Sequence, residues 1–231
     1  MISGFVIKKG TMTRVFQQDG TCIPVTKCLA IPLIVTQINK NTNDSLPASI
    51  QVAYGQKKRL DNPTFSKLKK LKIKKKPRAF TEFKLIAKDL PELGSEITFE
   101  SVFSVGEIVN VSGKSKGRGF AGVVKRHGFH RQPVTRGQSD RTRAPGSIGA
   151  QTPGKVLKGK KMPGHFGNKQ ITVQNLKIID INSDKHEISI KGDLPGHKNA
   201  WLIVKKQASA KSPRGGQASA QSPAGGKGVK K

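Results

Sequence analysis

The sequence predicts a mainly β fold, an antiparallel barrel or sandwich from which basic segments extend. Three observations favour it. Short runs rich in Val, Ile and Thr alternate with Gly, Pro, Asn and Asp, a spacing typical of antiparallel strands joined by tight turns. Such runs lie on both sides of a glycine-rich stretch, residues 112–169. The positive charge is confined to a few segments, so the remaining chain resembles a neutral, foldable body.

The strand-like runs define the expected body. About 150 residues are available for it, enough to bury a core. Residues 1–111 would supply the first strands, with a basic insertion at about 55–95, and residues 170–206 would supply the last ones. The turns Asp19-Gly20 and Asn182-Ser183-Asp184 separate neighbouring runs. The expected strands are 13–17, 21–31, 33–40, 49–54, 96–103, 107–113, 171–182, 186–192 and 200–206.

Charge is distributed very unevenly along the 231 residues, whose net charge is +29. Residues 55–88 carry 13 basic and two acidic groups, and residues 112–169 carry 14 basic groups and one acid, Asp140. Residues 207–231 carry five basic groups and no acid, so these three segments contain the whole excess. A chain of this charge requires a polyanionic partner, and nucleic acid is the first candidate.

The two smaller basic segments have different characters. In residues 62–77, Asn62 is expected to cap a short helix with Pro63 at its first position, and Pro77 to end it. This small insertion is therefore basic and partly helical. The C-terminal segment repeats "QASAKSPRGG" as "QASAQSPAGG". Such a composition cannot bury enough apolar surface to offset its chain entropy, so residues 207–231 are expected to be a disordered tail.

Two stretches in residues 112–169 resemble nucleotide-binding motifs, but neither meets the requirements of its motif. Gly113-Lys114-Ser115 resembles the end of a P-loop, but Ile108 stands where the first glycine is required. Gly117 to Gly122 reads G-x-G-x-x-G, yet Gly128 and Pro133 interrupt the helix that should follow. We expect no nucleotide cofactor and no small-molecule substrate.

Metal binding and catalysis are also disfavoured in this segment. His127, His130 and His165 have no Cys or Glu nearby to complete a familiar ligand set, and the surrounding positive charge opposes a divalent cation. Cys22 and Cys28 lack metal-site spacing and are read as free thiols in a reducing cytosol. An RNA-processing enzyme using His127, His130 and Asp140 remains an alternative, although Asp140 stands alone among arginines that would keep it ionised.

The composition of residues 112–169 favours RNA. Twelve glycines and few large apolar residues prevent a packed core there. Arginine offers forked donors to phosphate, lysine adds charge, and Phe120, Phe129, His130 and Phe166 are available to stack on unpaired bases. We expect an extended arm that orders among phosphates. The chain shows no apolar run long enough for a membrane span and no secretory signal, so a cytoplasmic protein is expected.

Several blocks also resemble a known family. The residues "MISGFVIKKGTMTRVF", "VSGKSKGRGFAGVVKRHGF", "RAPGSIGAQTPGKVLKGKKMPGHFGN" and "ITVQNLKIIDIN" are similar, in order, to the third protein of the large ribosomal subunit in its bacterial form. The resemblance covers most of residues 1–206. It implies a closed antiparallel β-barrel of the translation-protein type, with a long loop reaching through 23S-type rRNA toward the peptidyl-transferase centre. Neighbouring ribosomal proteins would be further partners, and no catalysis is implied.

The resemblance and the basic composition together select the candidate rRNA-binding residues. Residues 114–126 would line the base of the arm, 143–153 would approach its tip, and 155–168 would form its return. Gln151 stands where some bacterial members carry a methylated glutamine, so its methylation is a hypothesis. The candidates are Lys114, Lys116, Arg118, Phe120, Lys125, Arg126, His127, His130, Arg131, Arg136, Arg141, Arg143, Gln151, Lys155, Lys158, Lys160, Lys161, His165 and Asn168.

The predicted function is structural: an rRNA-binding constituent that nucleates large-subunit assembly. The alternative is a histone-like, general nucleic-acid-binding protein. That alternative predicts basic side chains spread over one folded surface, whereas here they gather in a glycine-rich insertion.

Overall fold

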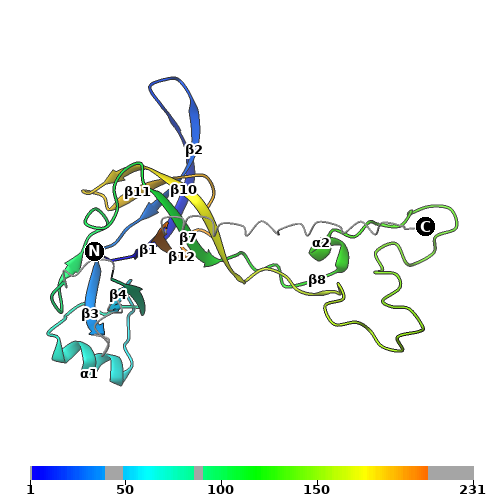
Figure 1. Ribbon diagram of the computed structural model, residues 1–231, viewed down its shortest axis with the longest axis horizontal. Helices are drawn as coiled ribbons and strands as arrows, with labels where there is room; N and C mark the ends of the chain where they lie inside the picture. Colours follow the sequence, from blue (N-terminus) through cyan, green and yellow to red (C-terminus); the bar gives the residue numbers. More distant parts are fainter. Residues whose placement is uncertain (1, 40–48, 86–90, 208–231) are drawn as a thin grey trace, which may run out of the picture.

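Six strands form a closed antiparallel ring in the computed structural model, which describes residues 2–39, 49–85 and 91–207 (Figure 1). Around the ring the order is β1, β12, β7, β10, β11 and β2, and β2 pairs again with β1. The strands are β1 (Gly4–Phe16), β2 (Cys22–Leu29), β7 (Ile108–Lys114), β10 (Gln170–Asn182), β11 (Glu187–Lys191) and β12 (Trp201–Lys206).

Alternating burial explains why these segments form the ring. In β2, Ile23 and Val25 are buried while their neighbours Cys22 and Pro24 are exposed, as expected when successive side chains point to opposite faces. Strand β7 alternates in the same way, and its buried Gly113 permits a close approach. A Cβ at Gly113 would stand 2.3 Å from Leu202 Cδ2 on β12.

The outer parts of β1 and β2 extend beyond the ring as a two-stranded hairpin, at the top of Figure 1. Its turn confirms the predicted Asp19-Gly20 signal. Gly20 has a φ of +75°, and the Gln17 N–H donates to the Thr21 carbonyl at 3.0 Å. Glycine adopts this left-handed conformation without steric cost.

A second antiparallel sheet lies beside the ring, with strand order β5, β4, β3, β6. Residues 33–39 and 49–54 were expected among the strands of the body's barrel, but they lie in this second sheet instead. The reason is that the basic segment supplies β5, which pairs along the whole of β4 and gives it a partner outside the ring. The strands are β3 (Leu33–Asn39), β4 (Ser49–Tyr54), β5 (Ala79–Lys84) and β6 (Glu96–Ile97).

The strand predicted over residues 96–103 is wrong beyond Ile97. Phe99 instead begins a turn in which its carbonyl accepts hydrogen bonds from the N–H groups of Val102 and Phe103. Phe99 and Phe103 then stack with ring centroids 4.8 Å apart. The alternation of apolar residues in this segment is therefore compatible with a buried turn as well as with a strand.

Helix α1 (Asn62–Lys70) confirms the expected helix with different ends. Asp61 occupies the N-cap position, and Pro63 lies in the first turn, where its missing N–H costs nothing. The helix ends long before Pro77, because Lys72 turns with a φ of +55° and the Ile73 N–H donates back to Leu68 O at 3.1 Å.

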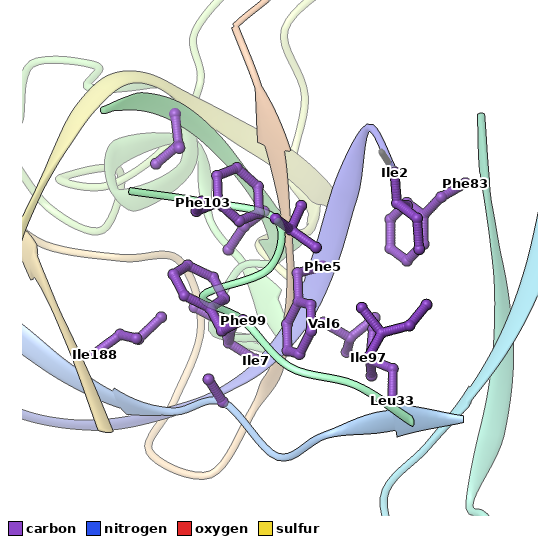
Figure 2. Close-up of a cluster of buried hydrophobic side chains, with 14 of the residues drawn as sticks. Ile2, Phe5, Val6, Ile7, Leu33, Phe83, Ile97, Phe99, Phe103 and Ile188 are labelled. Carbon is purple, nitrogen blue, oxygen red and sulfur yellow. The ribbon is translucent and has the colours of Figure 1, made fainter. Parts of the chain in front are cut away.

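One buried cluster joins the ring to the second sheet (Figure 2). Phe5 and Phe99 meet edge to face with centroids 5.2 Å apart. Val6, the next residue of β1, lies beside Leu33 and Ile97 of the second sheet in Figure 2. Consecutive residues of β1 are therefore buried on both faces of the strand.

The remaining elements lie between β7 and β10. They are β8 (Phe120–Ala121), the short helix α2 (Val123–His127) and β9 (Gly164–His165), and β8 pairs with β9. The prediction of a mainly β fold with antiparallel sheets is confirmed. The predicted disordered tail falls almost wholly on residues 208–231, which lie outside the described residues.

Candidate nucleic-acid interface

The arm, residues 112–169, leaves and re-enters the ring at two neighbouring strands. Lys114 of β7 pairs with Gln170 of β10, and the Ser115 N–H donates to Lys169 O at 2.9 Å. In Figure 1 the chain runs from the end of β7 outward past β8 and α2 and then returns to β10. The arm is therefore a very long connection between two adjacent antiparallel strands.

Backbone contacts hold the two limbs of the arm together near its base. The Arg118 N–H donates to Phe166 O at 2.8 Å, and the Phe166 N–H donates to Gly119 O at 2.9 Å. Gly167 has a φ of +76°, and a Cβ there would stand 2.0 Å from Lys116 O. Only glycine fits at this position, because both the conformation and the close approach exclude a side chain.

An aromatic and basic cluster covers the base of the arm. Phe120 of β8 pairs with His165 of β9, and their rings meet edge to face with centroids 5.9 Å apart. The Arg118 guanidinium lies 5.2 Å from the centroid of the Phe166 ring. Phe120 remains 70% exposed, so its ring is available to a base from outside the protein.

Arg126 and His127 differ from the other candidates because they bond within the arm. Arg126 Nη1 donates to the Met162 carbonyl at 2.7 Å, and His127 Nε2 lies 3.0 Å from the same oxygen. Both side chains are half-buried. They fasten α2 to the returning limb, so their first role is to position the arm.

Beyond α2 the arm has almost no structure of its own. Residues 128–163 form no helix or strand. Isolated turns occur instead, such as the Gly154 N–H donating to Gln151 O at 3.0 Å. After Gly113, only Ala121 and Val123 are buried in the whole arm. No hydrophobic core therefore determines the arm's path.

The other predicted candidates all present exposed side chains. None of the basic ones forms an ion pair within the part of the chain that the structure describes. The exposed candidates are Lys114, Lys116, Arg118, Phe120, Lys125, His130, Arg131, Arg136, Arg141, Arg143, Gln151, Lys155, Lys158, Lys160, Lys161, His165 and Asn168.

A second basic surface lies on α1. Leu68 is buried beneath the helix, and Lys67 bonds to Gln37 Oε1 of the second sheet at 2.9 Å. Lys69 and Lys70 are exposed. This division agrees with the predicted helix, which rests on the body and turns a lysine face outward.

The catalytic alternative gains no support from the geometry. The His127 ring is held by Met162, and Asp140 contacts the neighbouring Ser139 hydroxyl at 3.3 Å. Among residues 2–39, 49–85 and 91–207, no three His, Cys, Asp or Glu side chains gather as a metal site. In the same residues, no helix is both long and apolar enough to span a bilayer.

Sequence reasoning missed residues that the fold brings to the base of the arm. Arg78, Lys169, His197 and Trp201 line one groove together with the arm's first and last residues. Lys169 belongs to the basic segment, and Trp201 is the only tryptophan in the chain. Arg78 also belongs to a basic segment, residues 55–88, and none of these sequence signals indicated that the residues meet.

A β body with a basic surface on α1, carrying a long, basic, coreless arm, defines a nucleic-acid-binding protein. Residues 81–216 match the family model "Ribosomal protein L3", and the chain belongs to that family. It is 41% identical to the large ribosomal subunit protein uL3 of Dehalococcoides mccartyi, over 89% of this chain and 98% of the relative. The uL3 proteins of Herpetosiphon aurantiacus and Thioalkalivibrio sulfidiphilus are also 41% identical, over 91% of this chain and 99% and 100% of theirs.

Proposed function

We propose that this chain is a structural protein of the large ribosomal subunit that binds rRNA through its arm and catalyses no reaction. The observation that carries the proposal is the arm, which has 14 basic groups against one acid and almost no buried residues. Its relatives are named as proteins of the large ribosomal subunit.

The arm's charge explains how it would bind. Its exposed Lys and Arg groups repel one another until phosphates neutralise them, and counterion release then favours the complex. Contacts to phosphate and ribose fix position without reading sequence. The paired limbs at the base would fix where the arm enters the RNA. The conformation of residues 128–163 would be determined by the RNA around them.

The finer assignments follow from the family resemblance. The closed ring would be a barrel of the translation-protein type, formed by strands on either side of the arm. Lys114, Lys116 and Arg118 would bind rRNA at the base, residues 143–153 would lie near the peptidyl-transferase centre, and Lys155 to Asn168 would bind on the return. The partners would be 23S-type rRNA and neighbouring large-subunit proteins, and binding would occur early in assembly.

Sedimentation tests the proposal. A tagged full-length chain is expressed in bacterial cells, and the lysate is separated on a sucrose gradient. We expect the chain in the large-subunit fractions and, after ribonuclease treatment, near the top. Sedimentation as a free protein without ribonuclease would contradict the proposal.

A competition assay separates this function from the histone-like alternative. A labelled rRNA fragment bound to the chain is competed with unlabelled structured rRNA and, separately, with unlabelled duplex DNA. We expect the rRNA to displace the fragment at a lower mass concentration than the DNA. Equal competition would favour the general nucleic-acid-binding protein.

Methylation of Gln151 remains a hypothesis. Its exposed position at a turn would leave the amide accessible to a modifying enzyme. Peptide mass spectrometry of the ribosome-bound chain should show a shift of one methyl group, and an unshifted peptide would remove the hypothesis.

A further inference from the structure

An open groove of about 980 Å³ lies where the arm joins the body. Residues far apart in the sequence form its walls: both limbs of the arm near Lys114 and Lys169, the end of β4 at Tyr54, and the start of β12 at Trp201. The groove exists only because the ring brings β7, β10 and β12 together beside the second sheet.

Trp201 is held in a fixed position on the groove's wall. Its ring lies 5.1 Å from that of Tyr54, with the two planes 60° apart. Gly55 makes room for the indole, because a Cβ at Gly55 would stand 2.8 Å from Trp201 Cζ2. The indole is half-buried and still lines the groove, which is the placement of a stacking surface for an aromatic ligand.

The polar lining of the groove is entirely neutral or basic. Arg78, Lys114 and Lys169 are exposed, and none of them forms an ion pair within residues 2–39, 49–85 and 91–207. His165 and His197 add donors, and the lining contains no Asp or Glu. The charge of the groove therefore complements an anion.

One wall of the groove is fastened by a buried lysine. Lys9 Nζ bonds to Asp193 Oδ1 at 2.9 Å, and it also donates to the Leu194 carbonyl. These bonds fix the loop that leads to His197. Gly196 in this loop has a φ of +87°, and a Cβ there would stand 2.7 Å from Lys114 O. The wall is thus packed closely against the base of the arm before any ligand binds.

We propose that this groove binds an unpaired RNA nucleotide, with its base against the Trp201 indole and its flanking phosphates at Arg78, Lys114 and Lys169. The proposal rests on the proposed function and adds a defined site to it. An unpaired nucleotide is favoured because the bases of a duplex are already stacked and paired, so they cannot reach an indole on a groove wall. Base–aromatic stacking beside cationic groups is the usual way in which proteins hold single strands.

Trp201 itself supplies the measurement, because it is the only tryptophan in the chain. The full-length protein is titrated with a labelled ten-nucleotide single-stranded RNA and, separately, with an RNA duplex of the same length. Anisotropy of the label reports total binding, and tryptophan fluorescence reports the groove. We expect both RNAs to bind but only the single strand to quench Trp201.

Matched variants test the contacts. Arg78→Gln should weaken single-strand binding about fivefold to tenfold, whereas Arg59→Gln removes the same charge from an exposed site outside the groove and should have little effect. Trp201→Ala should weaken it about tenfold, the size of one lost stacking contact, and Trp201→Phe should restore most of the affinity. Unchanged melting temperatures would show that the variants are folded.

Three results would overturn the inference. Anisotropy without quenching would remove the groove as a nucleotide site but leave the proposed function intact. Equal effects of Arg78→Gln and Arg59→Gln would show that charge acts without a defined site. Equal quenching by a ten-residue polyglutamate peptide would indicate a general anion or acidic-peptide site. If neither RNA bound at all, the proposed function itself would fail.

Discussion

The ring and the arm belong to one chain, yet different forces shape them. The ring encloses fully buried apolar side chains, among them Phe5, Ile178 and Leu202. The arm has only Ala121 and Val123 buried beyond Gly113, and backbone bonds and close glycine contacts hold its base. Burial of apolar surface fixes the ring in water, whereas the outer arm needs a partner that cancels its charge. The difference shows that a buried core shapes the ring, whereas no such core shapes the outer arm.

Removing the arm should have the largest effect. Because β7 and β10 are adjacent and Lys114 pairs with Gln170, an Asn-Gly turn can replace residues 115–169 and close a hairpin. The shortened protein should keep its β circular dichroism spectrum but disappear from the large-subunit fractions of a gradient. Normal incorporation of this variant would show that the arm is not the anchor.

Salt dependence should distinguish the two regions next. If about ten of the arm's basic groups meet phosphate, log Kobs for rRNA should fall against log salt with a slope of roughly −7 to −9. The armless protein keeps the lysine face of α1 and should retain less than half of that slope. Filter binding at several salt concentrations provides the measurement, and equal slopes would place the contacts on the body.

The same amino acid should matter very differently in the two regions. Phe5 is fully buried in the ring and Phe120 is 70% exposed on the arm. Phe5→Ala should lower the free energy of unfolding by about 3–5 kcal/mol, since it leaves a cavity. Phe120→Ala should change it by less than about 0.5 kcal/mol. Urea denaturation measures both, and a large loss at Phe120 would contradict the contrast.

A glycine pair tests how the base of the arm is held. Gly167→Ala would place a Cβ 2.0 Å from Lys116 O at a φ of +76° and should cost about 1–3 kcal/mol of local strain. Gly122→Ala meets nothing within 4 Å and serves as the control. Hydrogen exchange at the Arg118 and Phe166 amides should accelerate only in Gly167→Ala. Similar exchange in both variants would show that the close approach is not needed.

The smallest effect concerns the thiol of Cys28. Burial raises the pKa of this thiol from 9.0 to about 11, although a hydrogen bond from the Gly10 backbone and the nearby Lys9 charge oppose the rise. The unfolded chain therefore loses this proton at lower pH than the folded chain. The stability that the protonated thiol contributes is fully present below pH 9 and is lost as the pH rises toward 11.

Alkylation should separate the two thiols at pH 8.5. Cys22 is exposed and should react quickly, whereas Cys28 should react only after denaturant is added. The stability of Cys28→Ala should fall less steeply than that of the parent between pH 9 and pH 11. Rapid labelling of both cysteines in the native protein would contradict the burial of Cys28.

Local patterns were sufficient for much of the fold. The alternation in β2, β7 and β11 gave their positions closely, and Asp19-Gly20 gave the hairpin turn. The pattern failed at residues 98–103, because apolar residues such as Phe99 and Phe103 can be buried by a turn as well as by a strand. The candidate rRNA-binding residues of the arm stay predictions, selected from the basic composition and the family resemblance, neither of which depends on what packs beside each side chain.

By itself, the sequence determined the mainly β class, the basic arm and the family, because composition and motifs can be read directly along the chain. Only the tertiary structure decided that residues 33–39 and 49–54 pair in a second sheet, and that Arg78 and Trp201 meet Lys169 in one groove. The periodicity of a sequence predicts which face of a strand is apolar. It does not predict which strands will pair with that strand's hydrogen-bonding edges. The choice among those partners is made when distant segments bury their surfaces together.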